Sequence, residues 1–224
     1  MLRDEIIVDK LPVRVINNRV LVKIEDTFSG FRTKGGIDLV NLTTEDTWGD
    51  SHQYNISEFV PRWGDVYVVP DLVSKGSFNY DTDVEVQHGD IVFWSLVSFQ
   101  GHIPIVYEKQ RYLLVDYHEI LCLIRDNEII PVNGYGLFSP IGTEEKVLSF
   151  VKKNKVSDVW KLEYLPKKNV RYIDKNRQPA DVWEKGDNVH LLVRSSPFKI
   201  EGTINKLLDK DLYACPMSYI ICSV

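Results

Sequence analysis

The chain has 224 residues, of which 44% are hydrophobic and 26% are charged, and its net charge is -5. This composition excludes a disordered protein and supplies enough apolar residues for one large domain or two small ones. The negative charge argues against a protein that binds the phosphate backbone of nucleic acids, because such proteins are usually basic.

The N-terminal stretch MLRDEIIVDK carries three acids and no long apolar core, so we expect neither a signal peptide nor a transit peptide. No apolar run of the sequence approaches the roughly 20 residues that span a bilayer, and we expect no membrane contact. Cys122, Cys215 and Cys222 show no CxxC spacing and are predicted to be buried free thiols. Free thiols are typical of a reducing cytoplasm.

Most apolar segments are short, rich in β-branched or aromatic residues, and bounded by turn residues, which predicts strands. The clearest examples in chain order are RVLVKI (19–24), DVYVVP (65–70), GDIVFWSLVSF (89–99) and YHEILCLI (117–124). This pattern is typical of all-β proteins built from small barrels or sandwiches.

Four pairs of similar segments follow one another in the same order along the chain and indicate an internal repeat. The paired segments start at Ile16 and Val132, at Asp65 and Lys161, at His88 and Lys185, and at Arg111 and Asp211. Their offsets are 116, 96, 97 and 100. We therefore predict two copies of one β-domain, at about 16–124 and 130–224, within domains at 1–126 and 127–224.

The fall of the offset from 116 to 96 means that the second copy lacks 20 residues present in the first, between Thr27 and Arg62. That region, the arm, contains TKGGIDLVNL (33–42), in which two glycines lead into exposed apolar residues. In an extended segment Ile37 and Leu39 share one face and Asp38 points away. The arm is interpreted as a mobile loop whose tip a partner buries; the alternative is an ordinary β-hairpin with a glycine turn.

The first copy resembles the GroES family of co-chaperonins. NNRVLVKI is similar to the family's first strand, KGGIDL to the tip of its mobile loop, and WGDVYVVPD to the strand after that loop. VQHGDIVFW and YLLVDYHEILCLI are similar to its later strands, and the second copy is a more distant relative through EKGDNVHLL and MSYIICSV. Asp38 departs from the family, which has an apolar residue there, and the arm is longer than usual.

The resemblance implies an all-β fold of two tandem GroES-like small β-barrels, the first with a long mobile loop at about 27–62. It implies a homo-oligomeric ring that caps a GroEL-type chaperonin and assists ATP-dependent folding in the cytoplasm of a bacterium or a phage-infected host. The loop residues expected to bind the chaperonin's apical domain are Gly35, Gly36, Ile37, Asp38, Leu39 and Val40.

The sequence offers no sign of chemistry. The five histidines lack metal-ligand spacing, and neither a P-loop nor a GxSxG motif is present. We predict no enzymatic activity, no cofactor, no metal and no nucleic-acid partner. The alternative function is a viral or cellular structural or assembly protein whose arm makes subunit–subunit contacts. An enzyme with a GroES-like substrate domain is disfavoured, because no nucleotide-binding domain accompanies the repeat.

Overall fold

The computed structural model of the chain describes residues 6–15, 18–24, 31–32, 38–39, 63–71, 73, 84–95, 103–141, 159–167, 181–192, 197–200 and 211–224. Within these ranges the regular elements are β-strands and short 3₁₀ turns, which confirms the all-β prediction. The strands form two large sheets and one small one. No helix in the described ranges is long and apolar enough to cross a membrane.

The first sheet has eight strands, paired antiparallel except for β1 on β7. Across the sheet they follow the order β1 (Ile6–Ile7), β7 (Ile103–Tyr107), β8 (Gln110–Asp116), β2 (Arg19–Lys23), β5 (Trp63–Val68), β6 (Ile91–Trp94), β9 (Ile120–Arg125) and β10 (Glu128–Pro131).

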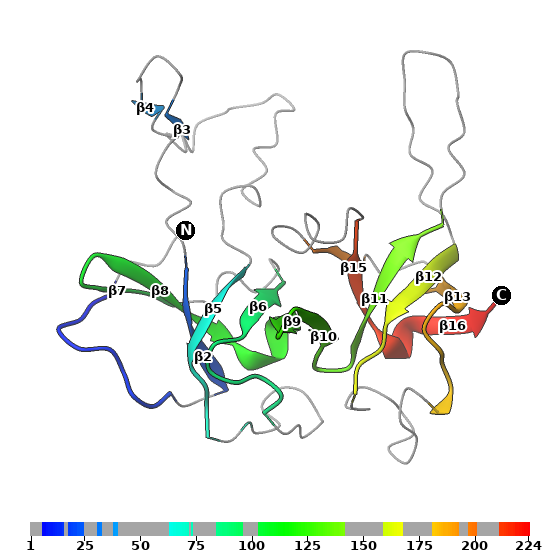
Figure 1. The fold of residues 1–224 in the computed structure, drawn as a ribbon, viewed down its shortest axis with the longest axis horizontal. Coiled ribbons are helices and arrows are strands. Elements are labelled where there is room, and N and C mark those ends of the chain that lie inside the picture. Colours follow the sequence, from blue (N-terminus) through cyan, green and yellow to red (C-terminus); the bar gives the residue numbers. More distant parts are fainter. Residues whose placement is uncertain are drawn as a thin grey trace, which may run out of the picture.

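The second sheet has six strands in the order β14 (Phe198–Lys199), β15 (Tyr213–Pro216), β11 (Tyr135–Pro140), β12 (Val159–Tyr164), β13 (Asn188–Leu191) and β16 (Ile220–Ser223). This order repeats the run from β7 to β9 in the first sheet. The 3₁₀ turns η3 (Tyr117–Glu119) and η5 (Met217–Tyr219) also stand at equivalent places, each before the last strand of its copy. Figure 1 shows the sheets side by side along the longest axis, with β16 and the C-terminus at the far end of the second.

Irregularities of strand pairing recur at equivalent positions in the two sheets. The β2–β5 pairing shifts register at Leu21/Val22, and β11–β12 shifts at Leu137/Phe138, an offset of 116. The β6–β9 pairing shifts at Phe93/Trp94, and β13–β16 shifts at His190/Leu191, an offset of 97. Because bulges re-aim side chains and interrupt pairing, their repetition shows that both halves share one backbone plan.

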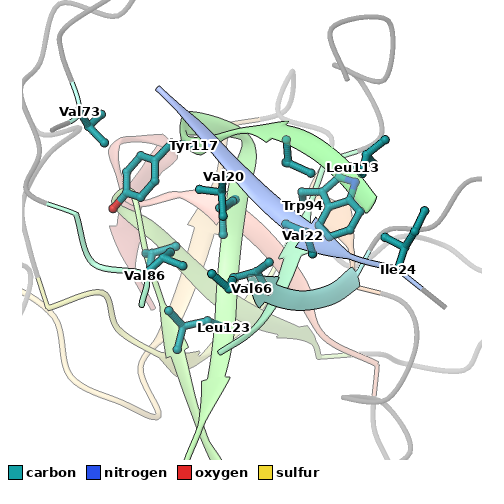
Figure 2. Close-up of a cluster of buried hydrophobic side chains, with 14 residues drawn as sticks. Val20, Val22, Ile24, Val66, Val73, Val86, Trp94, Leu113, Tyr117 and Leu123 are labelled. Atoms are coloured by element: carbon teal, nitrogen blue, oxygen red, sulfur yellow. The ribbon is translucent and has the colours of Figure 1, made fainter. Parts of the chain in front are cut away.

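Each sheet has an apolar cluster of its own. In the first, alternate residues of β2 face the interior, and Figure 2 shows Val20 and Val22 beside Val66 and Trp94. In the second, a separate cluster surrounds the fully buried Phe138 and includes Trp160.

A third cluster, here called the junction cluster, joins the two sheets. Its members from the first sheet are Phe93, Leu121, Cys122 and Ile124, and its members from the second half are Tyr135, Leu137, Ile200, Leu212 and Ala214. The predicted domain boundary at 126/127 lies in the turn between β9 and β10. β10 pairs with β9, so the first sheet extends to Pro131 and the second begins at β11.

Candidate functional site

The two ends of the arm leave the first sheet from neighbouring strands. β2 ends at Lys23 and β5 begins at Trp63, and Lys23 pairs with Asp65. A Cβ atom at Gly64 would lie 2.5 Å from the backbone oxygen of Lys23, so the strands approach more closely there than a side chain permits. The base of the arm is therefore held by direct backbone contact.

The strand β8 secures the same base from its other side. The backbone N–H of Ile24 donates to the Arg111 oxygen at 3.2 Å, and the Gln110 side chain donates to the Ile24 oxygen at 2.9 Å. Both bonds hold the backbone of Ile24, the residue that follows β2. The point at which the chain leaves the first sheet toward the arm is therefore fixed.

Two short strands lie within the arm. β3 (Phe31–Arg32) pairs antiparallel with β4 (Asp38–Leu39) in a separate two-stranded sheet, with Phe31 opposite Leu39 and Arg32 opposite Asp38. The chain therefore reverses direction between positions 32 and 38, the interval that holds both glycines. This pairing has the form of the hairpin that the sequence left open as the alternative.

Of the predicted docking residues, Asp38 and Leu39 lie in β4, where the structure gives their backbone pairing. Gly35, Gly36, Ile37 and Val40 lie outside the described residues. The predicted mobility of residues 27–62 likewise concerns positions outside the described ranges, apart from β3 and β4, and stays a prediction.

Turns of Gly-Asp sequence precede β6 and β13, as the sequence predicted. Gly89 and Gly186 adopt φ values of +88° and +104°, which favour glycine. In each turn the aspartate carboxylate accepts a bond of 2.8 Å from the backbone N–H three residues earlier. Asp90 and Asp187 therefore brace equivalent turns.

The first sheet adds an ion pair to its turn. The Asp90 carboxylate is almost fully buried and accepts from Arg125 Nε at 2.8 Å and Nη2 at 2.7 Å. This bidentate contact raises the pKa of the Arg125 guanidinium. Arg125 Nη2 also donates to the Glu85 backbone oxygen, and the pair thus ties β9 to the segment before β6.

The connection between the sheets is fixed by Asn133, which is fully buried and adopts a φ of +53°. Its side-chain amide donates to the backbone oxygens of Tyr117 at 2.7 Å and Ile120 at 3.0 Å. Its backbone N–H donates to the Glu85 carboxylate at 3.0 Å. Sequence reasoning missed this anchor, although Asn-Gly at 133–134 is a known signal for positive φ.

The cysteines differ from the prediction at one position. Cys122 and Cys215 are buried, and burial raises the pKa of the Cys122 thiol, but Cys222 is exposed. The prediction was wrong there because β16 is an outermost strand of its sheet, and its last three residues are exposed. Within the described ranges, no three His, Cys, Asp or Glu residues gather as they do around a metal ion.

A scan against protein-family models and a search of curated proteins each found no match for the sequence.

Proposed function

We propose that the chain is a co-chaperonin of the GroES type. In this proposal each sheet closes into a small barrel, the chain forms a homo-oligomeric ring in the cytoplasm, and the arm docks on the apical domain of a GroEL-type chaperonin. The ring caps the folding chamber, and ATP hydrolysis remains with the chaperonin. The protein itself has no enzymatic activity.

The observation that carries the proposal is the position of the arm. Two sheets share one strand order, and the first connects β2 to β5 through residues 24–62, whereas the second connects β11 to β12 through 141–158. The long connection starts from a base braced at Gly64, and within it β3 and β4 run antiparallel. An arm with a fixed base and an apolar tip suits docking into a groove on a separate molecule.

The physical chemistry of such an arm fits reversible capping. Burying Ile37 and Leu39 contributes roughly 1.5–3 kcal/mol each, and ordering a glycine-containing segment offsets much of that free energy. A single arm then binds weakly, whereas several arms on one ring bind together with a large gain in avidity. Weak contacts that act jointly are also released jointly, as an ATP-driven cycle requires.

The test is a double substitution at the tip, Ile37→Ser with Leu39→Ser. We expect it to abolish nucleotide-dependent binding to a chaperonin and to leave the mass of the oligomer unchanged. Binding is measured by co-sedimentation and by ATP-dependent refolding of a client. Val182→Ser is the matched control, because Val182 is an exposed apolar residue of the second half.

Two results contradict the proposal. Normal capping by the double variant would show that the tip is not the anchor. Dissociation of the oligomer by the double variant would instead favour the assembly-protein alternative, in which the arm holds a neighbouring subunit.

A further inference from the structure

The connection between the two sheets, residues 132–134, here called the joint, contains an asparagine followed by a glycine. This Asn-Gly pair at 133–134 occurs nowhere else in the sequence. Asparagine loses its side-chain amide most readily before glycine, because the next backbone nitrogen attacks the side-chain carbonyl carbon and no Cβ atom hinders its approach. The joint therefore carries the position of the chain at which spontaneous deamidation is chemically favoured.

The backbone conformation of the joint does not itself require the glycine. The Met217 N–H donates to the Gly134 oxygen at 3.0 Å, as the Tyr117 N–H donates to the Asn18 oxygen at 2.7 Å in the first copy. The offset of 116 makes Gly134 the counterpart of Asn18. Their φ values are +70° and +57°, so an asparagine adopts the conformation that the joint needs. Asparagine at position 134 would preserve this geometry and hinder the attack.

The closed joint withholds Asn133 from this reaction. The residue is fully buried, which keeps out the water that the reaction consumes. Its side-chain amide donates to the backbone oxygens of Tyr117 at 2.7 Å and Ile120 at 3.0 Å. Both bonds have to break before the amide nitrogen leaves as ammonia. Deamidation of Asn133 therefore has to wait for the joint to open.

A carboxylate of the first sheet holds the joint closed. The Glu85 side chain accepts from the Asn133 backbone N–H at 3.0 Å. The backbone of Glu85 is itself fixed, because its N–H donates to the Tyr117 hydroxyl at 2.7 Å and its oxygen accepts from Arg125 at 3.0 Å. The offset of 97 makes Val182 the counterpart of Glu85, so the second copy has no carboxylate there. The Glu85 carboxylate is therefore specific to the joint and is not part of the repeated backbone plan.

We propose that Asn133-Gly134 is a modification site that becomes reactive when the joint opens, and that its deamidation prevents the joint from closing again. The Gly134 nitrogen loses its proton and forms a bond to Cγ of Asn133, and the side-chain amide leaves as ammonia. Water then opens the resulting succinimide ring to aspartate or isoaspartate. The reaction consumes water, releases ammonia and needs neither an oxidant nor a reductant. This inference is independent of chaperonin binding.

The product lacks the groups that the closed joint uses. A carboxylate only accepts hydrogen bonds, so the backbone oxygens of Tyr117 and Ile120 lose their donor. The new negative charge belongs to a fully buried residue whose backbone already binds the Glu85 carboxylate. Burying an unpaired charge is costly, and isoaspartate also lengthens the backbone of the joint by an extra carbon atom. Deamidation therefore separates chains that have opened from chains that have stayed closed.

Ageing of the full-length chain tests the protection of Asn133. The chain is kept in mildly alkaline buffer with and without urea, and peptide mass spectrometry measures deamidation at each asparagine. In urea Asn133 should react before every other asparagine. Without urea its rate should fall by at least about tenfold, because the reaction then depends on local opening. Exposed Asn127 is the internal control and should change little. Equal rates at Asn133 with and without urea would overturn the proposal.

Two variants separate the opening of the joint from the chemistry. Glu85→Val introduces the residue that the second copy carries and leaves a buried N–H without its acceptor. It should raise the rate of deamidation without urea by about tenfold, and the rate in urea should stay the same. Gly134→Asn should abolish the preference for Asn133 in urea and leave the melting temperature unchanged. A wild-type rate for folded Glu85→Val, or a preference that survives Gly134→Asn, contradicts the proposal.

Asn133→Asp tests what the modification does to the joint. Cys122 is buried in the junction cluster, and Cys215 is buried in the separate cluster around Phe138. In Asn133→Asp a thiol reagent should label Cys122 at least about tenfold faster than in the wild type, with Cys215 still protected. Asn127→Asp adds the same charge at an exposed position and should leave both thiols protected. Unchanged protection of Cys122 would overturn the proposal, and so would equal labelling of Cys215, because the whole chain would then have unfolded.

Discussion

The two halves of the molecule share their strand order, their bulges and their Gly-Asp turns, yet they bury equivalent residues against different neighbours. Leu21 of β2 and Leu137 of β11 are both fully buried. The N-terminal segment covers Leu21, whereas the first sheet covers Leu137 through the junction cluster. The strand order and the bulges are therefore set within each half, whereas the burial of a residue depends on the neighbouring segment that covers it.

The largest expected effect contrasts the counterparts Leu121 and Ile221. Leu121→Ala leaves a cavity in the junction cluster and should lower the free energy of unfolding by about 2–5 kcal/mol. Ile221→Ala should lower it by less than about 0.5 kcal/mol, because the side chain is mostly exposed. Urea unfolding of dilute protein measures both values. Equal losses would show that β16 is as well covered as β9.

A smaller effect distinguishes two glycines of the β2–β5 and β11–β12 pairs. At Gly64 a Cβ atom meets the backbone oxygen of Lys23, which cannot move aside, so Gly64→Ala should cost about 1–3 kcal/mol. At Gly136 a Cβ atom meets the side chains of Met217 and Phe138, which can shift more readily than backbone atoms, so Gly136→Ala should cost less than Gly64→Ala. Thermal unfolding of the two variants checks the ranking, and the reverse order would refute the rigid base of the arm.

The smallest effect leaves stability unchanged and concerns thiol reactivity. At pH 8 the exposed Cys222 should react with a thiol reagent in the native protein, while its counterpart Cys122 should react only after unfolding. Burial raises the pKa of Cys122, so the reactive thiolate is absent from the folded state at that pH. Counting labelled thiols by mass spectrometry before and after denaturation tests this. Rapid native labelling of Cys122 would mean that the junction opens.

The sequence predicts the all-β class and the places where the two halves correspond, because short β-branched runs and turn residues act locally. The offsets of 116, 97 and 100 carry Leu21, Phe93 and Cys122 onto Leu137, His190 and Cys222, which have the same pairing in the second sheet. Gly89 and Gly186 are predictable for the same reason, since a positive φ is a local requirement.

Features that depend on distant neighbours escaped prediction. The sequence around Cys222 reads as a buried strand, and only the order of strands shows that β16 is outermost. The contacts of Asn133 with Tyr117 and Glu85 likewise depend on segments that pairing brings together. For the arm, the composition of the tip predicts a docking role, but no local rule identifies the partner.

The hairpin of β9 and β10 has a consequence for the order of folding during synthesis. All eight strands of the first sheet lie before position 132, so the ribosome completes them before it adds any strand of the second. Domains generally fold as units from the N-terminus. The emerging second half then meets Phe93, Leu121 and Ile124 already arranged as a template, and the junction forms between tethered partners at any cellular concentration of the protein.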